Sequence, residues 1–134
     1  MTAALSSNFT MMASNPLPGS HPGPDHVQIQ HMPVNDQWYV SALKFGSNGW
    51  VSRPFDAAAG VALQQRAEAY IAAHPKSDYA KFGAPFLTIT TDAGAYTYRA
   101  ATGETHELYQ AVLAAADAPV TPRAATHGRV VRYE

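Results

Sequence analysis

The feature that most constrains the fold is an alanine-rich stretch at residues 55–74, which has the pattern of an amphipathic helix. Its apolar face is formed by residues at helical spacing: Leu63, Ala67, Tyr70, Ile71 and His74. Asp56 is predicted to be the N-cap, because its carboxylate can accept a backbone N–H of the first turn. Pro75 disfavours helical backbone at the residue before it, so the helix is predicted to end at His74. Small side chains make up much of the apolar face, so we expect this helix to lie flat across a sheet.

The rest of the chain shows mainly strand patterns. Strands are predicted from alternating, β-branched or aromatic residues at 26–32, 38–45, 50–53, 86–91 and 95–99. Residues 48–49 and 92–94 are turn signals that join neighbouring strands into hairpins. A second helix is predicted over residues 102–116, with a threonine as its cap, and a short last strand at 129–133 is left open.

The order of these elements predicts the fold class. A hairpin followed by a helix occurs twice, at 38–74 and at 86–117, which gives the order β-β-β-α-β-β-α. Because consecutive strands usually pair, this order predicts an α+β fold, with an antiparallel sheet of about four to six strands and both helices packed on one face. The strand at 38–45 is apolar on both of its faces, which favours cover from both sides.

Residues 1–25 are predicted to be an extended N-terminal arm, and residues 26–134 a single α+β domain. Repeated proline and glycine between residues 14 and 25 forbid a regular helix or a central strand there. Two alternatives stay open for the arm. Either it is a flexible tail, or it is held in a groove of this chain or of a neighbouring copy, which would be a route to an oligomer. The apolar residues that would anchor it are Leu5, Phe9, Met11 and Met12.

Composition excludes several classes of function. The chain has 134 residues, a formal net charge of −1 and 14% charged residues, so it lacks the basic surface of a strong nucleic-acid binder. It has no cysteine, which excludes disulfides, thiolate metal sites and cysteine nucleophiles. It has no apolar run of the roughly 18–20 residues that a membrane span requires, and no basic signal-peptide region. We therefore expect a cytoplasmic protein without a membrane segment.

The six histidines form no recognisable metal motif. His26 and His31 are five residues apart, so on one strand they would face opposite sides of the sheet. Glycine loops for phosphate and nucleophile elbows are absent from the sequence. We therefore expect no metal and no cofactor, and the sequence favours a protein without catalytic activity. A small enzyme remains the first alternative, in which His74 or His106 would form an acid–base pair with one of four carboxylates: Asp56, Asp78, Asp92 or Glu104.

Aromatic residues at strand positions, with arginines beside them, are the candidate partner-binding residues: Trp38, Tyr39, Trp50, Arg53, Tyr96, Tyr98 and Arg99. Aromatic and arginine side chains are enriched at the centres of protein interfaces. The sequence therefore predicts a small protein-interaction protein that acts sterically, as an inhibitor or as an assembly subunit. Its small size and its lack of recognisable motifs are typical of phage or mobile-element accessory proteins. The expected partner is another protein or a second copy of the chain.

The second alternative is a protein that stacks single-stranded nucleic acid on its sheet aromatics. The low positive charge argues against this alternative, because phosphate contacts supply much of the affinity for nucleic acid.

Overall fold

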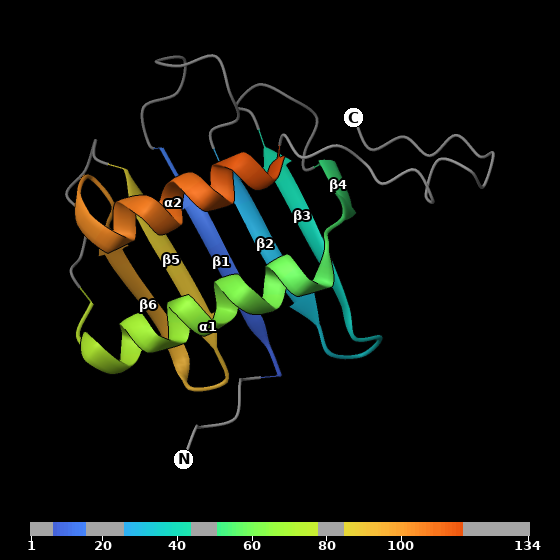
Figure 1. Cartoon of the computed structure of the whole chain (residues 1–134), viewed down its shortest axis with the longest axis horizontal. Helices are drawn as coiled ribbons and strands as arrows, with labels where there is room; N and C mark the ends of the chain where they lie inside the picture. Colours follow the sequence, from blue (N-terminus) through green and yellow to red (C-terminus); the bar gives the residue numbers. More distant parts are fainter. Residues whose placement is uncertain (1–6, 16–25, 44–50, 78–84, 117–134) are drawn as a thin grey trace.

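The computed structural model describes residues 7–15, 26–43, 51–77 and 85–116. Its elements follow along the chain as β1 (Phe9–Ser14), β2 (His26–Met32), β3 (Gln37–Leu43), β4 (Val51–Pro54), α1 (Ala57–Ala73), β5 (Phe86–Thr91), β6 (Gly94–Arg99) and α2 (Gly103–Ala116). The strands form a six-stranded sheet in the order β4-β3-β2-β1-β5-β6, in which all neighbours are antiparallel. Both helices lie across the same face of this sheet (Figure 1). The predicted α+β fold is thus confirmed, whereas the predicted turn at 48–49 and strand at 129–133 lie outside the described residues.

Strand β1 lies in the centre of the sheet, between β2 and β5. The sequence prediction placed its residues in an arm outside the domain, and this is wrong for residues 9–14. The observed order is therefore β-β-β-β-α-β-β-α, with one strand more than predicted. Phe9, Met11 and Ala13 point to the helices and are at most 1% exposed. The physical reason is that every second residue of this stretch is apolar, so one face of the strand packs in the core. The prolines farther along the chain do not change this pattern.

Helix α1 begins and ends as the sequence predicts. The Asp56 carboxylate accepts the N–H of Ala59 at 2.8 Å, which satisfies one of the free donors of the first turn. At the other end, the N–H of His74 donates to the carbonyl oxygen of Tyr70 at 2.8 Å. Pro75 has no N–H with which to continue the ladder. Capping thus fixes the length of α1, and with it the part of the sheet that the helix crosses.

Close contact between α1 and the sheet depends on Gly60. This glycine is buried over the indole ring of Trp38, and a Cβ atom at this position would lie 2.5 Å from Trp38 Cε3. Trp38 also contacts Phe9 on β1, with ring centroids 6.0 Å apart. The expectation that small residues let this helix lie flat on the sheet agrees with that geometry.

Helix α2 covers the middle of the same face, above the strands β1 and β2 (Figure 1). It begins directly after the predicted cap, Thr102, and its side chains Leu108 and Val112 are fully buried. The core is therefore a single layer between the two helices and one face of the sheet. That arrangement leaves the other face of the sheet, which we term the open face, without a described helix over it.

Candidate functional site

The structure divides the predicted partner-binding residues between the two faces of the sheet. Trp38 and Tyr98 lie on the helix-covered face and are 4% and 1% exposed. Tyr96 pairs with the buried Ile89 across β5 and β6, and it packs half-buried against the same core. Tyr96 and Tyr98 thus share a face, but it is the covered one. Trp38 and Tyr98 serve the core and present no ring to a partner, because packing against α1 and its neighbours buries both.

Tyr98 fixes the end of α1 to the sheet. Its hydroxyl donates to the carbonyl oxygen of His74 at 2.6 Å. Its ring makes an edge-on contact with Tyr70, with centroids 4.9 Å apart. Burial, together with the neighbouring tyrosines, raises the pKa of Tyr98 above the ordinary value of 10.0. The neutral hydroxyl is therefore the form that the fold requires.

Replacing Tyr98 with phenylalanine is expected to lower the free energy of unfolding by about 1 kcal/mol, because the bond to the His74 carbonyl is lost while the ring stays. Chemical denaturation of both proteins measures this difference. Tyr39→Phe, on the open face, is the matched control and should change stability by less. Equal stability of Tyr98→Phe and the wild type would contradict the assigned role of the hydroxyl.

Arg53 also has a structural partner. Its guanidinium donates to the carbonyl oxygens of Ala116, at 2.6 Å, and Ala115, at 3.4 Å. These carbonyls lie at the end of α2, where helical carbonyls lack intrahelical partners and the helix dipole favours a cation. Arg53 therefore joins the β4 edge of the sheet to α2. Trp50, its predicted neighbour in the interface, lies outside the described residues.

Tyr39 and Arg99 are the two predicted residues on the open face. Tyr39 is half-buried, and its hydroxyl accepts from the side-chain amide of Asn35 at 3.4 Å. Arg99 is exposed and pairs with Phe86 on the neighbouring strand. In strand β3, Trp38 and Val40 face the helices, whereas Tyr39 and Ser41 face the other way. Both side chains thus lie on the face of the sheet that the helices do not cover.

The open face is almost free of charge. Its half-buried polar residues carry hydroxyl or amide groups: Thr10, Gln28, Gln30, Ser41, Thr88 and Thr97. Its half-buried apolar or aromatic residues are Met12, Met32, Tyr39, Leu43 and Phe86. Arg99 and His26 are its ionisable groups besides Tyr39, and no aspartate, glutamate or lysine of the described strands lies on it. This composition resembles the core of a protein interface, from which charged residues are depleted.

Side chains close off the β6 edge of the sheet. The Ala100 N–H donates to the Pro85 carbonyl oxygen, and in an antiparallel pair every second residue bonds to the neighbouring strand. Thr97 and Arg99 are at the intervening positions, so their backbone N–H and carbonyl groups point away from β5. The Ser77 hydroxyl accepts the outward N–H of Thr97 at 3.1 Å. The Thr105 hydroxyl donates to the outward carbonyl of Arg99 at 2.7 Å. These contacts occupy groups that an added strand would need.

Proline protects the β4 edge. The N–H of Phe55 donates to the Trp38 carbonyl at 2.9 Å, which places Pro54 and Ser52 at outward-facing positions of β4. Proline has no N–H, so the outward side of this four-residue strand offers one donor, from Ser52. Both edges of the described sheet are therefore poor sites for strand addition. The open face is the other part of the sheet that a partner could contact.

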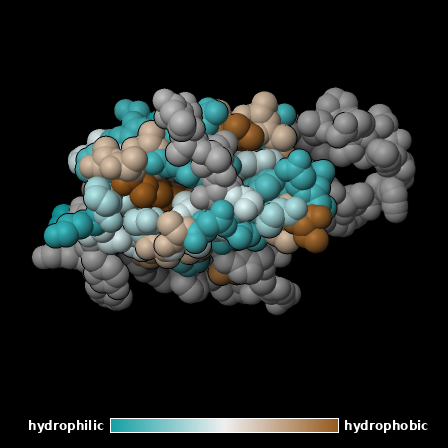
Figure 2. Space-filling model, turned by 90° about the horizontal axis from the view of Figure 1, so that it is seen from below, coloured by the Kyte–Doolittle hydropathy of each residue, from teal (hydrophilic) through white to brown (hydrophobic). Residues whose placement is uncertain are grey.

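Surface apolar residues are scattered at the end of the sheet where the β2–β3 and β5–β6 turns lie. Seen from that end, hydrophobic residues form separate small patches among hydrophilic ones (Figure 2). The strongly exposed large apolar residue in the described chain is Val34, at 86%, in the β2–β3 turn. Scattered apolar residues of this kind are normal on a protein surface and define no site.

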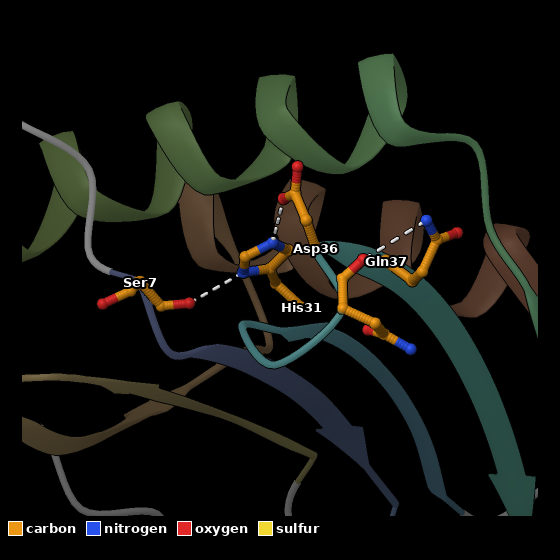
Figure 3. A network of polar contacts seen from close by, with 5 residues as sticks. Ser7, His31, Asp36 and Gln37 are labelled. Carbon is orange, nitrogen blue, oxygen red and sulfur yellow. Dashed lines mark hydrogen bonds and ion pairs between the residues drawn. The ribbon is translucent and has the colours of Figure 1, made fainter.

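A second cluster, which sequence reasoning missed, joins three separate parts of the chain. We term it the His31 clasp, formed by Ser7, His31, Asp36 and Asp92. His31 Nδ1 lies 2.7 Å from the backbone carbonyl oxygen of Ser7, and Nε2 lies 2.8 Å from Asp36 Oδ1 (Figure 3). Its ring also packs against Trp38, with centroids 5.1 Å apart. The sequence clue is the pair Asn35-Asp36, because asparagine and aspartate favour turns and a hairpin turn brings the end of β2 beside Asp36.

Asp92 holds the other side of Ser7. One carboxylate oxygen accepts the Ser7 N–H at 2.8 Å, and the other accepts the Asn8 N–H at 3.2 Å and the Asn8 side-chain amide at 2.9 Å. The Ser7 hydroxyl adds a contact at 3.3 Å. The backbone hydrogen bond from Ser7 is the largest of the effects that lower the pKa of Asp92, followed by the side-chain and backbone bonds from Asn8. The β5–β6 turn is thereby tied to the start of β1.

The His31 clasp does not have the chemistry of a serine nucleophile. The Ser7 hydroxyl faces Asp92 rather than the imidazole, and His31 meets only the carbonyl of Ser7. Both ring nitrogens of His31 are directed at oxygen acceptors, so neither is directed at the Ser7 hydroxyl as a general base would be. The clasp is therefore suited to holding backbone in place.

The acid–base pairs predicted from sequence do not form among the described residues. His74 Nδ1 lies 3.1 Å from the Tyr70 carbonyl, and His106 Nδ1 lies 2.9 Å from the Ala100 carbonyl. Their proposed carboxylate partners are engaged elsewhere: Asp56 in the α1 cap, Asp92 in the clasp, and Glu104 in an ion pair with Arg66 at 3.2 Å. Asp78 lies outside the described residues.

His26 and His31 face opposite sides of the sheet, as their spacing predicts. His26 pairs with Ser14 on the open face, where its Nδ1 lies 3.0 Å from the serine hydroxyl. Across the described ranges, no group of three or more histidine and carboxylate side chains is placed to hold a metal ion. Within the same ranges, neither helix has the length and apolar character needed to cross a membrane.

Comparisons with known proteins give no match: no family model, no curated protein and no solved structure is detectably similar to this chain.

Proposed function

We propose that this chain is a non-catalytic protein-interaction protein that acts sterically, as an inhibitor or as an assembly subunit, through the open face of its sheet. The observation that carries the proposal is the composition of that face. It is nearly uncharged, half-buried, and built from hydroxyl, amide, apolar and aromatic side chains. A face of this kind loses little on desolvation, because few charged groups have to give up water.

The shape of the sheet supports a contact through a face rather than an edge. Ser77 and Thr105 occupy outward backbone groups of β6, and Pro54 removes a donor from β4. A partner is therefore expected to lay side chains across the strands instead of adding a strand of its own. Tyr39, near the β4 side of the open face, is the aromatic anchor that we assign to this contact.

Nucleic acid fits this face poorly. Arg99 is its one arginine, and the described strands place no lysine there. Without several cations the phosphate contacts that dominate such binding are missing. A protein surface or a second copy of this chain is the partner class that the charge pattern favours.

Introducing a charge into the middle of the open face is expected to weaken association at least about tenfold, a change of about 1.4 kcal/mol. Gln28→Lys places an ammonium group on β2 near the centre of the sheet, where its flexible stem can keep the fold intact. Gln65→Lys adds the same charge to an exposed position of α1 and is the matched control.

Sedimentation velocity measures self-association of the three proteins, and affinity capture from host lysate measures association with other proteins. The proposal requires a partner or an oligomer that Gln28→Lys weakens and Gln65→Lys does not. A wild-type protein that remains monomeric and captures nothing would overturn it, as would equal binding by both variants.

A further inference from the structure

We propose that the His31 clasp is a proton-operated device that fixes the start of the central strand β1 to the two turns beside it. Deprotonation of His31 would release this end of β1. The inference concerns a conformational property of the fold and does not depend on the proposed function.

The geometry of the clasp favours a doubly protonated ring. Nδ1 faces a backbone carbonyl oxygen at 2.7 Å and Nε2 faces a carboxylate oxygen at 2.8 Å. Neither oxygen can donate a proton at neutral pH, so both nitrogens must carry a hydrogen for both bonds to exist. A neutral imidazole carries one hydrogen and must leave one of the two oxygens facing a lone pair. Loss of the proton therefore breaks the link to Ser7 or the link to Asp36.

The surroundings of His31 include the charges that matter to its protonation. Asp36, on the β2–β3 turn, contacts the ring directly. Asp92, on the β5–β6 turn, is connected to His31 through Ser7, which contacts both residues. Helix α1, which passes over the clasp (Figure 3), carries Arg66 and Glu68. Arg66 lies 3.2 and 3.8 Å from carboxylates of α2, and Glu68 accepts a hydrogen bond from Gln64. Among the described residues, Asp36 is the charged group in direct contact with the ring.

Two opposing effects act on the pKa of His31. Burial is the largest single effect and lowers this pKa, because it disfavours the charged form. The hydrogen bond to Asp36, the bond to the Ser7 carbonyl and the negative charge of Asp36 together raise it above the ordinary value of 6.5. The stabilisation is complete below that unfolded value, and it is lost as the pH rises through the higher pKa of the folded protein.

The position of the clasp explains why release would be local. Ser7 and Asn8 lie just before β1, whereas Phe9 and the following residues are paired to both β2 and β5. The amide hydrogens of Ser7 and Asn8 are held by Asp92. When His31 stops holding the Ser7 carbonyl, these two amides lose part of the support that keeps them at Asp92, while the sheet stays intact.

The test uses NMR on the full-length protein between pH 5 and 9. Ring resonances report the pKa of His31, and saturation-transfer exchange reports the Ser7 and Asn8 amides after correction for intrinsic base catalysis. The expected result is a loss of protection at both amides that follows the titration of His31. Unchanged protection while His31 titrates would overturn the inference.

Two variants sharpen this test. Asp36→Asn removes the charge and keeps a residue type that tolerates the positive φ of 53° at this turn position. Its amide can donate to Nε2, so a neutral ring satisfies both contacts, and the pKa of His31 should fall and the pH dependence of protection should shrink. Retention of the wild-type pKa and pH dependence in Asp36→Asn would contradict the assigned role of the carboxylate. His26→Gln, on the same strand but the opposite face, is the control and should leave both observations unchanged.

Discussion

Replacing Met11 with alanine is expected to lower the free energy of unfolding by about 2–5 kcal/mol, a large part of the stability of a domain of this size. Met11 is fully buried in the middle of β1, between Ile29 on β2 and Ile89 on β5. Truncation leaves a cavity at the centre of the sheet, where strands on both sides restrict collapse. Denaturant titration followed by far-ultraviolet circular dichroism measures the loss.

Met12 provides a control on the same strand. It is the next residue of β1 and is half-buried on the open face, where no described helix packs against it. Met12→Ala should cost much less than Met11→Ala, because little apolar surface is returned to water and no enclosed cavity forms. Similar costs at the two positions would show that β1 does not separate a covered from an open face. Deleting residues 1–25 should unfold the protein, because β2 and β5 would both lose the strand between them.

The strand β1 shows where sequence reasoning reached its limit. Phe9, Met11 and Ala13 have the alternation of a strand with one buried face. The proline- and glycine-rich residues that follow them dominated the prediction, since such composition is typical of tails and linkers. Local pattern alone does not distinguish a central strand from an anchored arm. The distinction depends on which distant strands pair with it, here β2 and β5.

Helix α1 was predictable because its determinants are local. An N-cap at Asp56, good helix formers and a proline after His74 act within a few residues of one another. The hairpin of β5 and β6 was predictable for the same reason, since residues 92–94 supply the turn and its neighbours alternate.

The candidate site was harder to predict because side-chain direction depends on tertiary packing. Alternation showed correctly that Tyr96 and Tyr98 share a face, and that Trp38 and Tyr39 do not. It did not show which face the helices cover. The structure places Tyr98 and Trp38 beneath them and leaves Tyr39 on the open face. The His31 clasp was missed because its contact with Ser7 joins residues 24 positions apart through a backbone atom.

Adding a side chain at Gly60 is expected to destabilise the protein nearly as much as the Met11 cavity, for the opposite reason. A Cβ at this position would lie 2.5 Å from Trp38 Cε3 and 2.9 Å from Trp38 Cε2, well inside van der Waals contact. The indole cannot retreat easily, because the rings of Phe9 and His31 pack against it. Either α1 must lift from the sheet or the indole must leave its position. Gly60→Val should therefore cost about 3 kcal/mol or more by overpacking.

A matched variant separates overpacking from helix propensity. Ala62→Val introduces the same side chain at an exposed position of α1, where only the propensity cost of about 0.5 kcal/mol applies. In a Trp38→Phe background the fused six-membered ring that Gly60 contacts is absent, so the cost of Gly60→Val should shrink by a coupling energy of about 1–3 kcal/mol. Denaturation of the four proteins of this cycle measures that coupling. Coupling near zero would mean that α1 does not rest on Trp38 through Gly60, and the small-residue face that the sequence places on this helix would then need another explanation.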